Sequence, residues 1–293
     1  MMVERFKRDL IKEFRNYDRM MLMQDLMAGL TVTAVAIPLA LAFGVGSGAT
    51  AASGLVTAII AGVIISALGG AYFQISGPTG AMAAILMSII AQYGLQGVFV
   101  ATVLAGIILV IAGVLHLGKL ISFIPMPVIS GFTSGIAVII AMGQIDNFFG
   151  VTSEGSSVTE KFLSYWQLGF EPNMTAVSIG LFVMLMMLLF PMRYSKYIPS
   201  SLFAIIVATA ANIVLNLDVA VVGNIPATLI LDDRLELASL LDFRTVIGLL
   251  APAVSIAVLA MIESLLCGAT ASRMTGARLD SNRELLAQGI GNI

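Results

Sequence analysis

The sequence is poor in charged residues, and the few that it has leave long stretches without any. Of its 293 residues only 11% are charged, against about a quarter in a typical soluble domain, while 59% are hydrophobic. No charge occurs in the 93 residues between Asp25 and Lys119, nor in the 26 residues between Lys119 and Asp146. About 20 consecutive apolar residues suffice for one membrane span. These stretches exclude a soluble enzyme, a nucleic-acid-binding protein and a disordered scaffold, and they indicate a polytopic membrane protein.

Cysteine and histidine are almost absent, which limits the chemistry that the chain can perform. The one cysteine, Cys267, excludes an internal disulfide framework and a cysteine metal site, and the one histidine, His116, leaves too little material for a metal cluster. No Ser/His/Asp set, carboxylate pair or zinc-ligand spacing can be assembled. The net charge of −2 provides no basic field for nucleic acid. We therefore expect no enzyme, no cofactor, no metal site and no nucleic-acid partner.

The apolar segments predict an all-α polytopic membrane protein with about eight spans. Only helices and closed barrels satisfy the backbone in lipid, and the period-two alternation of a membrane barrel is absent. A span needs roughly 17–25 residues, and one of the predicted segments is shorter. The predicted helices cover residues 26–46, 51–69, 79–92, 96–115, 125–145, 174–192, 197–217 and 245–272.

The basic residues predict the orientation of these spans. With the N-terminus inside, 12 of the 15 Lys and Arg residues fall in inner segments and three in outer ones, in agreement with the positive-inside rule. Residues 1–23, charged and amphipathic from Val3 to Arg19, then form a cytoplasmic interfacial segment, and residues 24–293 form the transmembrane domain. We expect a plasma (inner) membrane location with lipid as a partner.

Two predicted spans contain helix-breaking residues. Pro38 lies in the middle of span 26–46, where it removes a backbone hydrogen bond, so the helix is expected to kink or unwind there. A simple packing kink is the alternative. The second break is at Gly77, Pro78 and Gly80, and the helix after it, Thr79 to Gln92, has 14 residues. Its rise of about 21 Å is too short for a hydrocarbon core of about 30 Å.

The short segment therefore predicts a helix that begins inside the membrane after an extended entry, "YFQIS". The first amides of this helix, those of Thr79, Gly80 and Ala81, would have no partner within the helix. A free positive helix end at that depth is suited to an anion, and interrupted helices are typical of transporter binding sites. The alternative is a re-entrant turn whose amides are bonded by neighbouring side chains.

Glu263 is the only formal charge between Thr245 and Ser272. A carboxylate at membrane depth costs at least a few kcal/mol and is a functional candidate. It could take up a proton, or stay ionised beside a sodium ion or a basic partner. Cys267, four residues later, shares its helix face. The alternative is a structural role, in which Glu263 bonds a helix break across the bundle.

With these residues identified, the chain resembles the sulfate permease (SulP) family of anion transporters over nearly its whole length. The first span and its entry motif, "DLMAGLTVTAVAIPLALAFGVGSG", are similar to those of the family, and "QISGPTGAM" resembles the start of its broken third span. Two further segments resemble the family's seventh span and the turn after it, namely "YIPSSLFAIIVATAANIVL" and "VVGNIPATL". The last segment, "MIESLLCGATASRMTGARLDSNRELLAQGIGNI", resembles the family's eighth span and a highly specific motif that follows it, here "NRELLAQGIGN".

The resemblance implies seven plus seven spans in an inverted repeat, with spans 1 and 3 discontinuous and the anion between the ends of two half-helices. It also implies that this chain holds the first eight spans, and that the remaining spans, a STAS domain and a homodimer contact lie in parts absent here. Leu39 stands where the family often has glutamine, so one polar contact to the anion is lost. The implied anion contacts are Val35, Phe43, Ser76, Gly77, Thr79, Gly80 and Ala81, and the implied ion-coupling residues are Glu263 and Cys267.

The expected function is secondary active transport of a small inorganic anion by alternating access, with sulfate first and bicarbonate next. Glu263 with Cys267, in place of the aspartate and threonine of sodium-coupled relatives, favours a proton over sodium as the coupling ion. An uncoupled anion channel or exchanger that uses the same pocket is the alternative, and an intramembrane enzyme with Glu263 as acid or base is a third reading.

Overall fold

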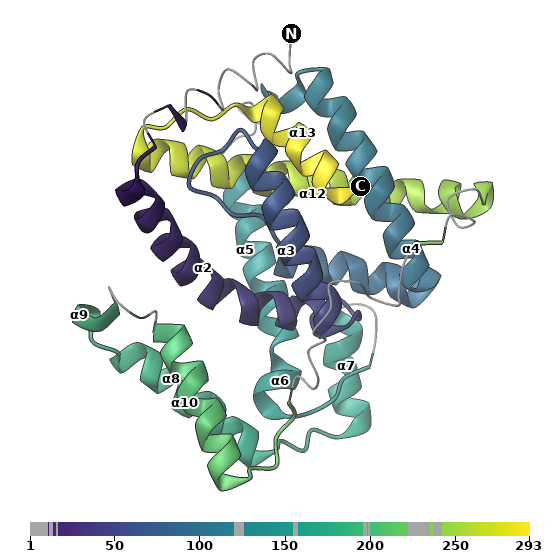
Figure 1. The fold of residues 1–293 in the computed structure, drawn as a ribbon. Coiled ribbons are helices and arrows are strands. Elements are labelled where there is room, and N and C mark those ends of the chain that lie inside the picture. The colour runs from purple at the N-terminus through teal and green to yellow at the C-terminus, as the bar shows by residue number, and fades with distance from the viewer. Residues whose placement is uncertain are drawn as a thin grey trace. The chain divides into compact units, whose positions relative to one another are not determined.

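The described part of the chain is helical and falls into two compact units (Figure 1). One unit consists of Met1–Pro38 and Phe182–Asn216, and the other of Leu39–Leu181 and Leu217–Ile293. The computed structural model describes residues 11, 14–15, 17–119, 126–154, 158–195, 198, 200–221, 235–236 and 242–293. Most of the predicted interfacial segment and the turn "VVGNIPATL" therefore lie outside the described residues.

All eight segments predicted as spans overlap helices, which confirms the all-α prediction for the described residues. Among the described residues, four helical stretches are long and apolar enough to cross a membrane, and two further apolar helices are shorter. The described helices of 16 residues or more are α2 (Arg19–Gly46), α3 (Ala51–Leu68), α4 (Gly80–Val114), α5 (Met126–Gly143), α8 (Met174–Leu189), α10 (Ser200–Leu215) and α12 (Phe243–Thr275). The remaining helices are α6 (Ile145–Phe149), α7 (Val158–Leu168), α9 (Met192–Ser195) and α13 (Ser281–Asn292).

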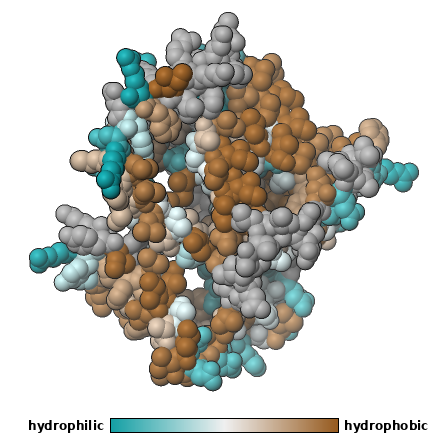
Figure 2. Space-filling view, in the orientation of Figure 1, coloured by the Kyte–Doolittle hydropathy of each residue, from teal (hydrophilic) through white to brown (hydrophobic). Residues whose placement is uncertain are grey.

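Large apolar side chains cover much of the outside of these helices, as Figure 2 shows for one face. Leu188 and Leu189 of α8 and Ile213 and Val214 of α10 are largely exposed. A soluble monomer rarely leaves apolar patches of this extent uncovered. Helices that are apolar on all sides are stable when lipid covers them. The surface is therefore that of a membrane protein.

Polar side chains fix where several helices begin. The hydroxyl of Thr50 accepts a hydrogen bond from the amide of Ser53 at the start of α3. Asp242 accepts one from the Arg244 amide at the start of α12, and Asp280 accepts one from the Arg283 amide at the start of α13. Such caps bond amides that have no partner within the helix. They place the helix starts at these residues.

Helix α2 continues through Pro38, which corrects the expectation of a discontinuous first span. Proline has no amide hydrogen, so the helix lacks one backbone hydrogen bond at this point. The turns on both sides of Pro38 nevertheless keep helical geometry, because a single missing bond does not end a helix. The boundary between the two compact units falls at the same residue.

Helix α4 is interrupted at Gly94, which has φ 69° and ψ −175°. Residues 80–93 and 95–114 are therefore two arms, which point in different directions in Figure 1. Positive φ is readily adopted only by glycine, so the glycine at position 94 allows the helix to break there. The chain before the first arm, residues 69–79, is not helical. A short helix after a non-helical entry agrees with the prediction, and the start of this helix inside the membrane stays a prediction.

The larger unit is held together by α4, α12 and α13, which share a hydrophobic core. Its fully buried side chains include Leu109 of α4, Leu249 of α12 and Leu285 of α13. Helix α13 lies directly on the second arm of α4, because a Cβ on either Gly106 or Gly289 would come within 2.7 Å of the other's carbonyl oxygen. Glycines at such points allow two backbones to touch. Helix α13 is thus an integral part of this unit.

A cluster outside the spans joins α6 to α7 through Asp146. Its carboxylate accepts hydrogen bonds of 2.6 Å from the Tyr165 and Ser153 hydroxyls. The ring of Phe170 packs edge-on against those of Tyr165 and Phe149, with centroids 5.7 and 5.1 Å away. Burial, and then the bond to Asp146, raise the pKa of Tyr165 from 10.0 to about 12.

We expect this cluster to lose its stabilising hydrogen bond between pH 10 and pH 12. The folded pKa of Tyr165 lies above its unfolded value, so the contribution is complete below pH 10 and disappears as pH rises through about 12. The difference in phenolate absorbance between the wild type and Tyr165→Phe isolates this group among the six tyrosines. A titration midpoint of Tyr165 near pH 10 would contradict the expected hydrogen bond to Asp146.

Candidate functional site

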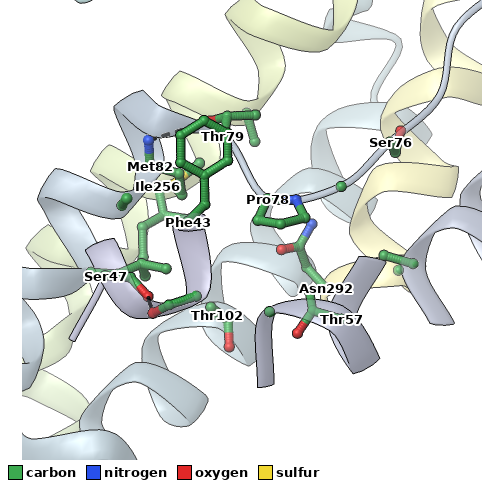
Figure 3. Close-up of a pocket in the computed structure, with 18 of the residues that line it drawn as sticks. Phe43, Ser47, Thr57, Ser76, Pro78, Thr79, Met82, Thr102, Ile256 and Asn292 are labelled. Carbon is green, nitrogen blue, oxygen red and sulfur yellow. Dashed lines mark hydrogen bonds between the residues drawn. The ribbon is translucent and has the colours of Figure 1, made fainter. Parts of the chain in front are cut away.

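A cavity of about 290 Å³ lies in the larger unit, between the end of α2, α3, the non-helical residues 69–79 (the extended segment), both arms of α4, α12 and α13 (Figure 3). Its wall is mainly apolar, with hydroxyl groups distributed over it. No Lys, Arg or His of the described residues lines it, and Glu263 is its one carboxyl group. The hydroxyls that line it belong to Ser47, Ser53, Thr57, Ser76, Thr79, Thr102 and Ser264.

The N-terminus of α4 opens at this cavity, where Gly77, Pro78 and Thr79 line the wall. Thr79 is the cap residue, with extended backbone, and its hydroxyl accepts a 3.3 Å hydrogen bond from the Met82 amide. Among the described residues no acceptor bonds the amides of Gly80 or Ala81. Unpaired amides give a helix end a partial positive charge. The cavity therefore lies at a positive helix end, and none of the described residues that line it has a basic side chain.

Glu263 of α12 lies at the same helix end. The Thr79 hydroxyl donates a 3.0 Å hydrogen bond to its carboxylate oxygen Oε2, and the Glu263 side chain is half-buried. The two residues are 184 positions apart in the sequence. The predicted anion-binding helix end and the predicted ion-coupling carboxylate thus share one hydrogen bond.

The structure brings together most of the residues that the sequence singled out. Gly80 and Ala81 begin α4 but do not line the cavity, and Val35 belongs to the other compact unit. The ring of Phe43, at the end of α2, lies at the cavity wall in Figure 3. The predicted site residues that do line the cavity are Phe43, Ser76, Gly77, Thr79, Glu263 and Cys267.

A polar cluster behind the cavity was missed by the sequence reading. Glu284 of α13 is buried and accepts hydrogen bonds from Gln74, Ser264 and Gln288, all three of which line the cavity. Ser264 follows Glu263 and turns toward Glu284 instead. The available signal was the spacing of Glu284 and Gln288, four residues apart on one face of α13.

No cluster of three or more His, Cys, Asp or Glu side chains that could bind a metal occurs among the described residues. Glu263 and Cys267 both line the cavity, and no other carboxylate of the described residues lines it. The chemistry available is therefore that of hydrogen-bond donors, one ionisable carboxyl and a polarised helix end, which suits the binding of a small ion.

The chain matches a family model described as the sulfate permease family over residues 22–293. YvdB of Bacillus subtilis, provisionally named a sulfate transporter, is 38% identical over 96% of this chain and 53% of its own length. The bicarbonate transporter BicA of a Picosynechococcus strain is 33% identical over 92% of this chain and 49% of its own length. The chain spans about half the length of these curated relatives.

Two solved structures are similar in fold. The transmembrane domain of a cyanobacterial bicarbonate transporter BicA superposes with a TM-score of 0.83 at 32% identity, over 94% of this chain and 72% of that one. The murine anion transporter Slc26a9, in an inward-facing state, gives a TM-score of 0.79 at 18% identity over 96% of this chain and 51% of that one. The second likeness concerns the fold alone.

Proposed function

Because this chain belongs to the sulfate permease family, whose members are transporters and not enzymes, we propose that it forms part of a secondary active transporter for a small inorganic anion. Sulfate is the first candidate, from the name of the relative YvdB, and bicarbonate the next, from that of BicA. The observation that carries the proposal is the free end of α4 beside Glu263 in a cavity without basic side chains.

The anion site is the N-terminus of α4. The hydroxyl of Thr79, which lines the cavity, replaces part of the water that an anion loses when it leaves bulk solution, and the amides of Gly80 and Ala81, which do not line it, contribute the positive charge of the helix end. Phe43, Ser76 and Thr79 line the same cavity. A helix end attracts negative charge without strong selection by shape, so closely related anions compete for it.

Glu263 provides the coupling. When ionised, its carboxylate accepts the Thr79 hydroxyl and places a negative charge at the helix end, which disfavours an anion there. When protonated, that repulsion is absent, and the carboxyl group can donate a hydrogen bond itself. Anion and proton are therefore bound together and carried together by alternating access. Cys267, on the same helix face, offers a weaker ligand for sodium than a hydroxyl does.

The proposal extends to the membrane location of the transporter, its orientation and its partners. The transporter lies in the plasma membrane with the N-terminus of this chain in the cytoplasm, in accordance with the 12 inner and three outer basic residues. The second half of the anion site and a homodimer contact belong to parts of the protein outside these 293 residues. Anion, coupling proton and membrane lipid are its partners.

The test is uptake of radiolabelled sulfate or bicarbonate by the full-length protein in proteoliposomes, with unlabelled anions as competitors. Thr79→Val removes both the cap of α4 and the donor to Glu263, so we expect uptake to fall by at least about tenfold. Thr270→Val is the matched control, because that exposed hydroxyl bonds only the Leu266 carbonyl of its own helix. We expect the control to transport normally.

The direction of a pH gradient separates the two functional classes. A coupled transporter accumulates labelled anion above its equilibrium level when the outside is more acidic, whereas a channel or passive exchanger cannot. Uptake by Thr79→Val at the wild-type rate would overturn the helix-end site. Uptake that never exceeds equilibrium would favour the uncoupled alternative.

A further inference from the structure

Glu284 is a second carboxylate of the larger unit, separate from Glu263, and it is 2% exposed. Its Oε2 accepts the amides of Gly70 and Ala71 at 3.0 and 3.2 Å. Its Oε1 accepts the Ser264 hydroxyl at 2.7 Å and the side-chain amides of Gln74 and Gln288 at 3.0 Å each. Five donors therefore converge on one buried side chain.

All five partners donate, which suits a carboxylate and no other side chain. A carboxylate has two oxygens with about four acceptor positions between them and nothing to donate. A glutamine in its place would turn an NH₂ group toward either two backbone amides or three side-chain donors. Bonds from donors to a buried charged acceptor are roughly twice as strong as neutral ones. The site is therefore built for a side chain whose two terminal oxygens both accept hydrogen bonds.

The donors tie α13 to the extended segment that leads into α4. Besides the bonds to Glu284, the carbonyl of Gly70 accepts the Asp280 amide at 2.9 Å, and Gln288 donates to the Ser76 hydroxyl at 2.9 Å. Asp280, Glu284 and Gln288 are spaced four apart, so one face of α13 holds the segment along its length. A Cβ on Gly70 would collide with the Asp280 carbonyl, so the segment lies directly on the helix.

The other end of the segment carries the anion site. Residues 69–79 end at Thr79, the cap of α4, whose hydroxyl bonds Glu263. Ser264, the next residue of α12, bonds Glu284. The segment is therefore held between two carboxylates, Glu284 at its start and Glu263 at its end, and one turn of α12 contacts both.

We propose that Glu284 is the positioning residue of the anion site: without touching the anion, it holds the extended segment so that the end of α4 faces the cavity. The inference rests on the proposed function of that helix end. Because segment and helix are continuous through Thr79, a shift of Gly70 and Ala71 is transmitted to the amides of Gly80 and Ala81. Glu284 acts on anion affinity, and Glu263 acts on coupling.

The test compares Glu284→Gln, Glu284→Asp and the wild type as full-length transporter in proteoliposomes. For Glu284→Gln we expect the KM for labelled anion to rise by at least about tenfold, with a maximal rate per folded protein within about twofold of the wild type. Glu284→Asp keeps the charge on a shorter side chain and is expected to recover part of the affinity. Asp242→Asn, which removes an exposed capping carboxylate of α12, is the control with unchanged KM.

A general loss of folding would lower the maximal rate in all conditions and leave KM in place, and that outcome overturns the positioning role. An unchanged KM in Glu284→Gln overturns it as well. Hydrogen exchange of the wild type supplies a test that needs no variant: the amides of Gly70 and Ala71 are expected to be protected, and rapid exchange there contradicts the proposal. Wild-type protein that moves no anion at all would instead overturn the proposed function.

Discussion

Glu263→Gln is expected to abolish accumulation of anion driven by a pH gradient and to spare exchange of anion for anion. Glutamine has nearly the shape of glutamic acid and can still accept the Thr79 hydroxyl. It cannot bind or release a proton, so the proton gradient no longer acts on the occupied site. In proteoliposomes with an acidic outside, labelled anion should rise only to its equilibrium level in the variant, and counterflow against internal anion should continue.

The control for this variant is Glu171→Gln. It makes the same replacement of a carboxylate by an amide, at an exposed residue before α8. Both proteins should fold and exchange anions, and only the Glu171 variant should accumulate them. Proton-driven accumulation by Glu263→Gln at the wild-type level would defeat the coupling role. Loss of exchange along with accumulation would indicate that Glu263 is needed for binding itself.

A negatively charged methanethiosulfonate reagent is expected to inhibit transport nearly completely by reacting with Cys267. This thiol is the only one in the 293 residues, is accessible, and lines the cavity of about 290 Å³. A sulfonate attached there fills much of the space in front of Thr79 and repels an anion from the helix end. Saturating transported anion should slow the modification, because it occupies the same cavity.

The experiment uses the full-length protein with any cysteine outside this chain replaced by serine. Cys267→Ser is the matched control and should transport with or without the reagent. Modification that proceeds at the same rate with and without anion would place Cys267 outside the binding site. Modification without inhibition would have the same meaning.

Much of the helical layout could be predicted from the sequence, because it depends on local properties. Long uncharged runs predict spans, and the rise of 14 residues shows that the helix after Thr79 is too short to cross the membrane. Gly94 then ends the first arm where glycine alone adopts the backbone geometry with ease. The continuity of α2 through Pro38 was not predictable in the same way, since proline kinks some membrane helices and breaks others.

The candidate site was predictable in its separate residues and not in its network. Thr79 and Glu263 each stood out locally, one by a helix break and one by a charge in an apolar run. Glu284 bonds Gly70 across 214 residues, and its position beside Arg283, in a polar stretch that also holds Arg278 and Asp280, looks like that of a solvated residue. Burial of that carboxylate becomes visible only when α13 is placed on α3 and α4, which is a tertiary property.

The glycine contact between Gly106 and Gly289 restricts how a transport cycle can proceed. Two backbones in direct contact resist sliding, because displacement along their axes would bring larger side chains such as Val110 to the same point. In the proposed alternating-access cycle we therefore expect the second arm of α4 and α13 to move as a single block. A change of geometry at the proposed anion-binding end of α4 would then be taken up at Gly94, where the helix is already interrupted, so we expect Gly94 to act as a hinge.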